Sequence, residues 1–261
     1  MPRQSRRLSD TGVYHVMLRG VNHCQLFEEP DDYEQFLTRL AAAKNDLAAK
    51  VFAYCVMTNH VHLLVREHTP GDIVSLMRKT LTPYAGWFNK KYGRTGALIA
   101  NRYKSECVQD DAYLLAVVRY IHRNPVEAGL TQRIDSYPWS SYPAYVAGSG
   151  SLVDTGFVLA MFGSEPPVAV SRFVGFHQDD PTGLVVNPFP AARDERQIRG
   201  EMAARYEGLE PHAIVGLPRA RRNAVIAYLR GQGFSVRQIE RATGVPRGVV
   251  SRVEPVPPHD A

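Results

Sequence analysis

The amino-acid sequence predicts an α+β fold with a ferredoxin-like antiparallel sheet, followed by a separate all-helical region. Up to about residue 145, segments with strand or helix periodicity follow in the order β-α-β-β-α-β-α, and the first six match the split βαβ arrangement. Residues 146–195 are rich in Gly, Pro and Ser. We therefore expect one domain over residues 1–145, a linker with short helices over residues 146–195, and a helical domain over residues 196–261.

The first four elements are a strand, a helix and a hairpin. Apolar side chains occupy every second position between residues 12 and 20, which is typical of a strand. The following helix is expected to begin at Pro30, because proline suits the first helical turn. Two apolar runs, residues 51–57 and 60–66, are then separated only by Thr58-Asn59, so we expect a β-hairpin there.

The last three elements of this region are a helix, a strand and a helix. The second helix begins at Asp72, and we expect Pro83 to kink it. Residues 102–108 form a candidate fourth strand. The third helix opens at Asp110-Asp111, where acidic side chains favour the positively polarised end of a helix.

The C-terminal region contains a helix-turn-helix pattern at about residues 233–253. Ser235 is suited to cap a first short helix, Gly244 to form the turn, and Pro246 to start a second helix. In this arrangement the second helix enters the major groove of DNA. The side chains expected to face DNA are Arg247, Ser251 and Arg252.

The charge distribution indicates a polyanionic partner. The formal net charge is +5, and no Asp or Glu occurs between Ile73 and Ser105. A second basic stretch, residues 219–252, holds a single acid, Glu240. Two separate basic regions predict two nucleic-acid contacts. In the first region the candidate DNA-binding residues are Arg78, Lys79, Lys90, Lys91, Arg94, Arg102 and Lys104.

The remaining composition points to a cytoplasmic protein. The three cysteines, Cys24, Cys55 and Cys107, form no closely spaced pair, so neither a disulfide framework nor a zinc ribbon is indicated. No segment approaches the roughly 20 apolar residues of a membrane span, and we expect no membrane partner.

Two histidines share one face of the expected third strand. His60 and His62 are two residues apart, and side chains at that spacing point the same way on a strand. Such a pair can hold a divalent cation, or can simply line a groove as hydrogen-bonded core residues. A nucleotide hydrolase with three alternate histidines is disfavoured, because Leu64 occupies the third position.

A tyrosine and an amide lie together on the third helix. Tyr120 and Asn124 are four residues apart, so they share one flank beside the apolar stripe of the helix. Pro125 disfavours helical geometry at Asn124, which we therefore expect at the helix end. The pair can address a site on the sheet, although Tyr120 can equally be a half-buried packing residue.

Three motifs together resemble those of the REP-associated tyrosine transposases, a group of HUH single-strand DNA transposases. They are NHVHLL at residues 59–64, RYKS at residues 102–105 and RYIHRNPVEAGL at residues 119–130. The resemblance covers roughly residues 10–145 in the family's order and spacing. Thr58 departs from the proline that is usual in the family, and the helix-turn-helix is not part of the minimal family pattern.

This resemblance implies a fold, a site and a chemistry. The fold is the HUH nuclease fold. The metal ligands are His60, His62 and Asn124, for Mg²⁺ or Mn²⁺, although mixed nitrogen and oxygen ligands also admit Zn²⁺ or Ni²⁺. Tyr120 is the nucleophile and forms a covalent link to the 5′ side of the cleaved strand. The rival nucleophiles Tyr103 and Tyr113 have no amide four residues later.

We accordingly predict a metal-dependent, single-stranded DNA endonuclease and strand transferase that acts on hairpin-forming repeats. The helix-turn-helix would bind an adjacent duplex or stem. The alternative is a DNA-binding regulator that recognises structured repeats without cleaving them. A replication-initiating nickase is a third, weaker hypothesis. The family resemblance leaves open whether the protein is a monomer or a homodimer.

Overall fold

The computed structural model describes residues 8–100, 102–148, 150–178, 195–206, 208–232, 234 and 236–256, with residues 195–197 described by their backbone only. The described residues divide into two compact units, one up to residue 178 and one from residue 195 onward. Residues 179–194 of the expected linker, and Gly233 and Ser235 of the expected helix-turn-helix, lie outside the described residues.

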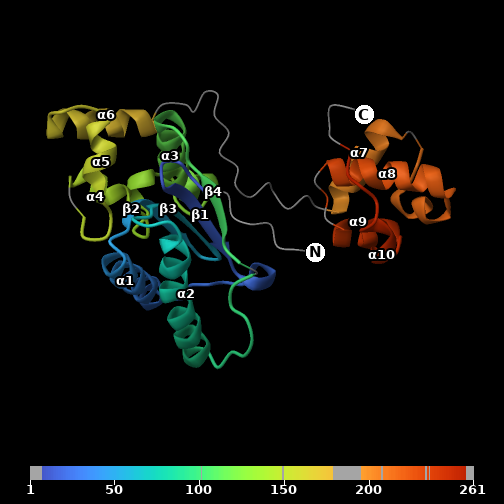
Figure 1. Ribbon diagram of the computed structural model, residues 1–261, viewed down its shortest axis with the longest axis horizontal. Coiled ribbons are helices and arrows are strands. Elements are labelled where there is room, and N and C mark those ends of the chain that lie inside the picture. Colours follow the sequence, from blue (N-terminus) through green and yellow to red (C-terminus); the bar gives the residue numbers. More distant parts are fainter. Residues whose placement is uncertain are drawn as a thin grey trace. The chain divides into compact units, whose positions relative to one another are not determined.

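The first unit is built on a four-stranded antiparallel sheet in the order β2-β3-β1-β4 (Figure 1). This order and the helices between the strands confirm the ferredoxin-like fold class predicted from the sequence. The four strands are β1 (Val13–Arg19), β2 (Lys50–Met57), β3 (His60–Arg66) and β4 (Lys104–Cys107).

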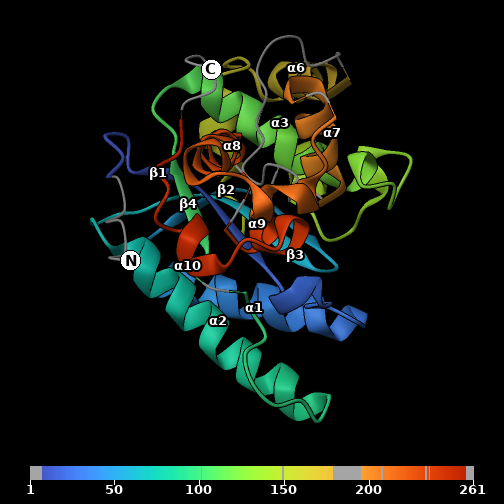
Figure 2. The same cartoon turned by 90° about the vertical axis from the view of Figure 1, so that its right-hand side faces the viewer.

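The helices α1 (Pro30–Asp46) and α2 (Asp72–Lys91) lie together on one face of the sheet (Figures 1 and 2). They cover a core to which β3 contributes Val61, Leu63 and Val65. Because successive strand residues point to opposite faces, burial of these three side chains directs His60 and His62 to the other face.

That other face is covered by α3 (Asp111–Glu127) and by three shorter helices, α4 (Tyr142–Val146), α5 (Thr155–Ala160) and α6 (Pro166–Gln178). The stripe of α3 that packs on the sheet side is fully buried and apolar. This buried stripe consists of Leu114, Val117, Val118 and Ile121. Elsewhere in the first unit, short 3-10 turns occur at Val21–His23 and Ile134–Ser136.

Residues 146–178 differ from the expected linker, because they are part of the first unit. The backbone of Ser141 pairs with Tyr54 on the outer edge of β2. Asp154 then accepts the amide N–H of Val51 at 3.1 Å and forms a 2.7 Å ion pair with Lys44. Phe173 of α6 is fully buried in the core under α3. Because these contacts cover the edge of β2, the first domain does not end near residue 145.

Two prolines lie inside helices rather than at their ends. The helix α2 continues through Pro83 to Lys91, and α3 continues through Pro125 to Glu127. A proline removes one backbone hydrogen bond, which the packing of the helix face outweighs here. Asn124 is therefore in the last turn of α3 and not at its end, which corrects the expectation from the sequence.

Residues that follow β1 hold the turn between β2 and β3 through backbone hydrogen bonds. Gly20 donates its N–H to the carbonyl of Asn59 at 2.9 Å, and Leu26 donates to the carbonyl of Thr58 at 2.8 Å. A side chain at Gly20 would meet the carbonyl oxygen of Cys24 at 2.2 Å, so only glycine fits. These contacts fix the residue that precedes His60.

The second unit is all-helical around its own core. Its elements are α7 (Glu195–Arg205), a 3-10 turn (Pro211–Gly216), α8 (Arg219–Gly231), α9 (Val236–Thr243) and α10 (Arg247–Val250). Gly244 has a φ of 73° and forms the turn between α9 and α10, as expected. The second helix of the expected motif is a single turn long, because α10 ends at Val250.

A directed chain of hydrogen bonds joins α3, α6 and β2 inside the first unit. The carbonyl of Phe173 can only accept, so Nδ1 of His177 donates to it at 2.9 Å. Nε2 of His177 then accepts from Nδ1 of His122, also at 2.9 Å. Nε2 of His122 accepts from the Ser141 hydroxyl, whose oxygen accepts the N–H of Tyr54. Both rings are fully buried, and in this chain of bonds each ring has one donating and one accepting nitrogen, as a neutral imidazole does.

This network predicts loss of stability in mild acid. Burial lowers the pKa of His177 from 6.5 to about 4, with Arg119 and Arg123 adding to the effect. Unfolded His177 gains a proton below pH 6.5, whereas the folded residue does so only near pH 4, so its contribution is lost as pH falls through this window. We expect the free energy of unfolding to fall by about 3 kcal/mol on this account.

Urea unfolding between pH 7 and pH 4 measures this loss. The variant His177→Gln keeps an acceptor for His122 but cannot titrate, so its stability should depend less steeply on pH than that of the wild type. His68→Gln, at an exposed position, is the matched control. Equal pH dependence in the wild type and His177→Gln would contradict the prediction.

Candidate active site

The histidine pair lies on the sheet face beneath α3. The ring centroids of His60 and His62 are 5.1 Å apart with their planes nearly perpendicular. His62 is 1% exposed, whereas His60 is half-buried at the end of the strand. The two rings therefore form one compact group, open toward solvent on the side of His60.

Asn124 reaches this group from α3. Its Oδ1 lies 3.3 Å from Nε2 of His60, and Oδ1 of Asn59 lies 2.7 Å from Nδ1 of the same ring. With both amides oriented as in the structure, Asn59 accepts the proton of Nδ1, which puts the lone pair of His60 on Nε2. In this tautomer Nε2 of His60 and Oδ1 of Asn124 are both acceptors. A cation is a group that two neighbouring acceptors can bind together.

Tyr120 lies over the same pair. Its ring centroid is 5.4 Å from that of His62, in an edge-to-face arrangement. Burial raises the pKa of the Tyr120 hydroxyl, and a hydrogen bond with Asn124 partly lowers it. The structure thus brings together all four residues that the sequence analysis placed in one site.

The electrostatics of the site favour neutral imidazoles beside a positive charge. Burial lowers the pKa of His60, and it lowers that of His62 well below its ordinary value. The charge of Arg19 lowers the pKa of both rings further. Neutral histidines have a lone pair available for a metal ion.

Two residues of β1 belong to this site and were missed from the sequence. Nε2 of the fully buried His15 is 3.1 Å from Nδ1 of His62, and its ring also contacts Tyr120 edge-on at 5.9 Å. Arg19 stands opposite His60 in the β1–β3 register. The strand alternation of residues 12–20 placed both side chains on one face, but only the strand order reveals which strand they adjoin.

The rival tyrosines lie elsewhere. The hydroxyl of Tyr103 donates to the carbonyl of Ile73 at 3.4 Å, within the core on the α1–α2 side of the sheet. Tyr113 is in the first turn of α3, two turns before Tyr120, where Glu106 raises the pKa of its hydroxyl in addition to burial. In the sequence, neither is followed four residues later by an amide, as Tyr120 is by Asn124.

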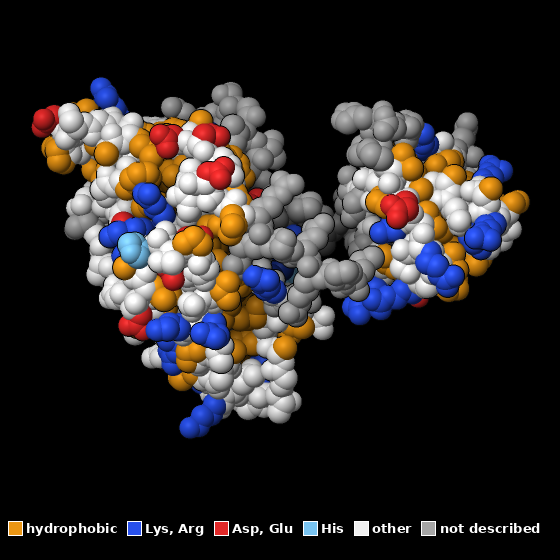
Figure 3. All heavy atoms as spheres, in the orientation of Figure 1, with side chains coloured by type: hydrophobic (Ala, Val, Ile, Leu, Met, Phe, Trp, Pro, Cys, Tyr) orange, Lys and Arg blue, Asp and Glu red, His pale blue; other side chains and the backbone are white. Residues whose placement is uncertain are grey.

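Most of the predicted DNA-binding residues of the first unit are on its surface. Figure 3 shows Lys and Arg side chains gathered over the part of this unit where α2 lies. Lys79 forms a 2.7 Å surface ion pair with Asp46, and Arg94 is half-buried against Cys24 and Phe88. Besides Lys79 and Lys91, the exposed members of the set are Arg78, Lys90, Arg102 and Lys104.

Lys91 differs from these residues because its charge is used in an ion-pair cluster of the protein itself. Its Nζ is 2.8 Å from Oδ1 of the fully buried Asp32 and 3.2 Å from both Glu29 and Asp31 at the start of α1. The hydrogen bond to Asp32 raises the pKa of Lys91. This placement favours a role in joining α1 to α2 over a contact with DNA.

The second unit presents a basic surface of its own, and its visible face carries more Lys and Arg than acidic side chains (Figure 3). Arg247 and Arg252 are exposed, and Ser251 is half-buried. The guanidinium of Arg252 donates to the carbonyl of Gly248 at 2.8 Å. Arg230 instead donates to the carbonyls of Ser251 and Val253, so it binds the segment after α10 to α8.

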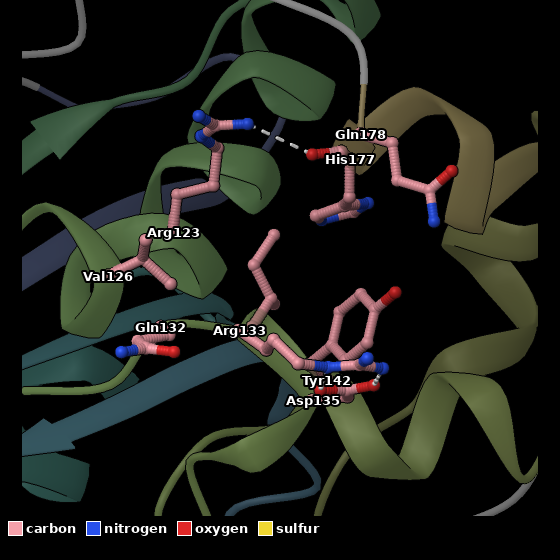
Figure 4. Close-up of a pocket in the computed structure, with 9 residues that line it drawn as sticks. Arg123, Val126, Gln132, Arg133, Asp135, Tyr142, His177 and Gln178 are labelled. Carbon is pink, nitrogen blue, oxygen red and sulfur yellow. Dashed lines mark hydrogen bonds and ion pairs between the residues drawn. The ribbon is translucent and has the colours of Figure 1, made fainter.

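A polar pocket between α3 and α6 is separate from the histidine site. In Figure 4, Arg123 donates to the carbonyl of His177 at 3.0 Å across its upper rim, and Arg133 pairs with Asp135 at its floor. The four site residues do not line it. The lining comprises Arg123, Val126, Gln132, Arg133, Ile134, Asp135, Tyr142, His177 and Gln178.

Across the described residues, no three His, Cys, Asp or Glu side chains form a group able to hold a metal ion by themselves. A metal at the histidine pair would therefore need Asn124 and water as further ligands. None of the helices in the described ranges combines the length and apolar character needed to cross a membrane.

Comparison with known proteins finds a family model that is similar to the larger part of the first unit. A search of curated proteins finds no match. Among solved structures, the chain is similar to one described as the structure of the REP associates tyrosine transposase bound to a REP hairpin. The two are 20% identical, the match covers 60% of this chain and 93% of that chain, and the TM-score is 0.48. Residues 9–124 match the family model described as transposase IS200 like. This part of the chain is therefore similar in sequence to the IS200-like transposases.

Proposed function

We propose that the first unit cleaves and rejoins single-stranded DNA at hairpin-forming repeats through a covalent link to Tyr120. The observation that carries this proposal is the meeting of Tyr120 and Asn124 with the His60–His62 pair. A pure DNA-binding protein has no need for a tyrosine hydroxyl beside one buried and one half-buried imidazole. The match of residues 9–124 to the IS200-like transposase model supports a DNA-processing reaction.

Tyr120 carries out the transesterification. Its hydroxyl oxygen forms a bond to phosphorus, the bond between phosphorus and the 3′ oxygen breaks, and the phenolic proton ends on the released 3′ hydroxyl. The 5′ side of the strand stays attached to Tyr120, so the phosphodiester energy is kept for rejoining to another 3′ hydroxyl. Burial raises the pKa of Tyr120, so the hydroxyl must lose its proton during the attack.

The donor set fits a divalent cation such as Mg²⁺ or Mn²⁺. His60 offers Nε2 and Asn124 offers Oδ1 from positions only 3.3 Å apart. Burial keeps both His60 and His62 neutral, so no proton has to leave before they bind an ion. When bound, a divalent ion polarises the scissile phosphate.

The DNA strand is proposed to follow the exposed cations of α2 and β4. Arg78, Lys90 and Lys104 are exposed, and backbone contacts of this kind supply most of the affinity for nucleic acid. In the second unit, α9 and α10 with Arg247 and Arg252 are proposed to bind duplex DNA.

Formation of a covalent adduct tests the nucleophile. Incubation with a labelled single-stranded hairpin and Mg²⁺ or Mn²⁺ should give a protein–DNA species that persists on a denaturing gel. Tyr120→Phe should abolish it, because the attacking oxygen is gone, whereas Tyr103→Phe and Tyr113→Phe should retain it. Absence of an adduct with every repeat tried would favour the DNA-binding regulator, and an adduct in Tyr120→Phe would exclude Tyr120.

The His60→Ala variant distinguishes the role of the histidine site in cleavage from the role of the surface cations in DNA binding. Loss of His60 should reduce cleavage to background, because it removes one ligand of the proposed cation. The affinity for uncleaved DNA should stay within a few fold of wild type, since backbone charge contacts dominate it. Fluorescence anisotropy with the hairpin measures this affinity. A collapse of DNA binding in His60→Ala would instead assign the histidine a structural role.

Lys90 and Lys91 are adjacent but should respond differently to substitution. Lys90→Ala should weaken DNA binding and reduce its salt dependence by about one counterion, because Lys90 is exposed. Lys91→Ala should lower the thermal unfolding temperature, because buried Asp32 loses its cation. Equal loss of affinity in both variants at unchanged stability would refute this assignment.

A further inference from the structure

We propose that Arg19 is a further catalytic residue, whose guanidinium binds a non-bridging oxygen of the scissile phosphate. The inference rests on the proposed function, because it concerns the same site. It adds a protein cation to a reaction otherwise assigned to a tyrosine and three metal ligands.

The sheet places Arg19 beside the histidine pair. Arg19 pairs directly with His60 in the β1–β3 register, and Met17 pairs with His62. Side chains at positions 15 and 19 of β1 share one face, and His15 on that face contacts both His62 and Tyr120. Cβ atoms of directly opposed residues are about 4.5–5.5 Å apart, so the side chain of Arg19 leaves the sheet next to that of His60.

The side chain of Arg19 lies on the sheet face that carries both imidazoles. Arg19 is directly opposite His60, and two residues earlier on the same face Met17 is opposite His62. Arg19 is half-buried, so its field there is less screened by water than that of an exposed arginine. It is therefore a cation within the site and not a remote surface charge.

The charge balance of the site calls for an anion. The proposed ligands His60, His62 and Asn124 are all neutral, so a bound divalent ion would keep its full charge of +2. Arg19 raises the local charge to about +3, which repels a cation in the absence of DNA. A phosphodiester brings −1, and its negative charge grows as Tyr120 attacks. The arrangement is thus matched to a phosphate in its transition state, and guanidinium is well suited to phosphate oxygens.

In this scheme one bond to phosphorus forms, one breaks, and one proton is transferred. Tyr120 forms the bond to phosphorus, the 3′ oxygen leaves with the phenolic proton, and Arg19 neither gives nor takes a proton. Its contribution is purely electrostatic. Removal of a single donor of this kind typically slows the chemical step by about 100- to 1,000-fold.

The variant Arg19→Gln tests this role, with Arg66→Gln as the matched control. Arg66 ends β3 at the opposite corner of the strand pair, next to Val13, and is exposed. We expect Arg19→Gln to slow single-turnover adduct formation about 100- to 1,000-fold with little change in affinity for uncleaved hairpin DNA. Arg19→Lys should recover part of the rate, and added guanidinium should partly rescue the variant Arg19→Ala.

A second measurement distinguishes catalysis from folding. Without DNA, Arg19→Gln should bind Mn²⁺ with a lower Kd than the wild type, because a repelling charge is removed; electron paramagnetic resonance of free Mn²⁺ reports this directly. Wild-type Mn²⁺ affinity and wild-type adduct rate in Arg19→Gln would overturn the inference but leave the proposed function intact. Weaker Mn²⁺ binding in Arg19→Gln would show a structural role and also overturn it. Failure of the wild type to form any adduct would overturn both proposals.

Discussion

The packing of α3 across one face of the sheet is the constraint on which the site depends. Its apolar stripe is fully buried, which fixes the rotation of the helix about its own axis. At about 100° per residue, Tyr120 and Asn124 then face the start of β3, where His60 and His62 lie. On the opposite face, burial of Val61 and Leu63 against α1 and α2 turns His60 and His62 toward α3. Two separate hydrophobic cores therefore set the geometry of one polar site.

The same packing explains the unusual chemistry of the site. Burial keeps the imidazoles neutral, and the adjoining strand β1 adds His15 and Arg19 from the same face. A neutral donor set next to an arginine is poorly suited to hold a cation alone and well suited to hold a cation together with a phosphate. Binding of metal and of DNA should accordingly favour each other in this protein.

The sequence predicted the sheet, its helices and the four proposed site residues, because each follows from local periodicity or from a short motif. It could not reveal His15 and Arg19 as neighbours of the site, since β1 joins β3 through a register between segments far apart in the chain. The Gly-rich and Pro-rich composition of residues 146–178 concealed a packing role that depends on Asp154 and Phe173. The sequence did not distinguish Lys91 from the other basic residues, because its ion pair with Asp32 joins two helices far apart in the chain.

Anomalous diffraction from crystals of the protein bound to hairpin DNA and grown with Mn²⁺ tests the central claim most directly. The account predicts one strong peak bonded to Nε2 of His60, Nε2 of His62 and Oδ1 of Asn124, at distances of about 2.0–2.3 Å. The hydroxyl of Tyr120 should lie on the open side of that ion. A peak at another place in the protein, or a structure in which Mn²⁺ is absent from these three ligands at saturating concentration, would contradict it.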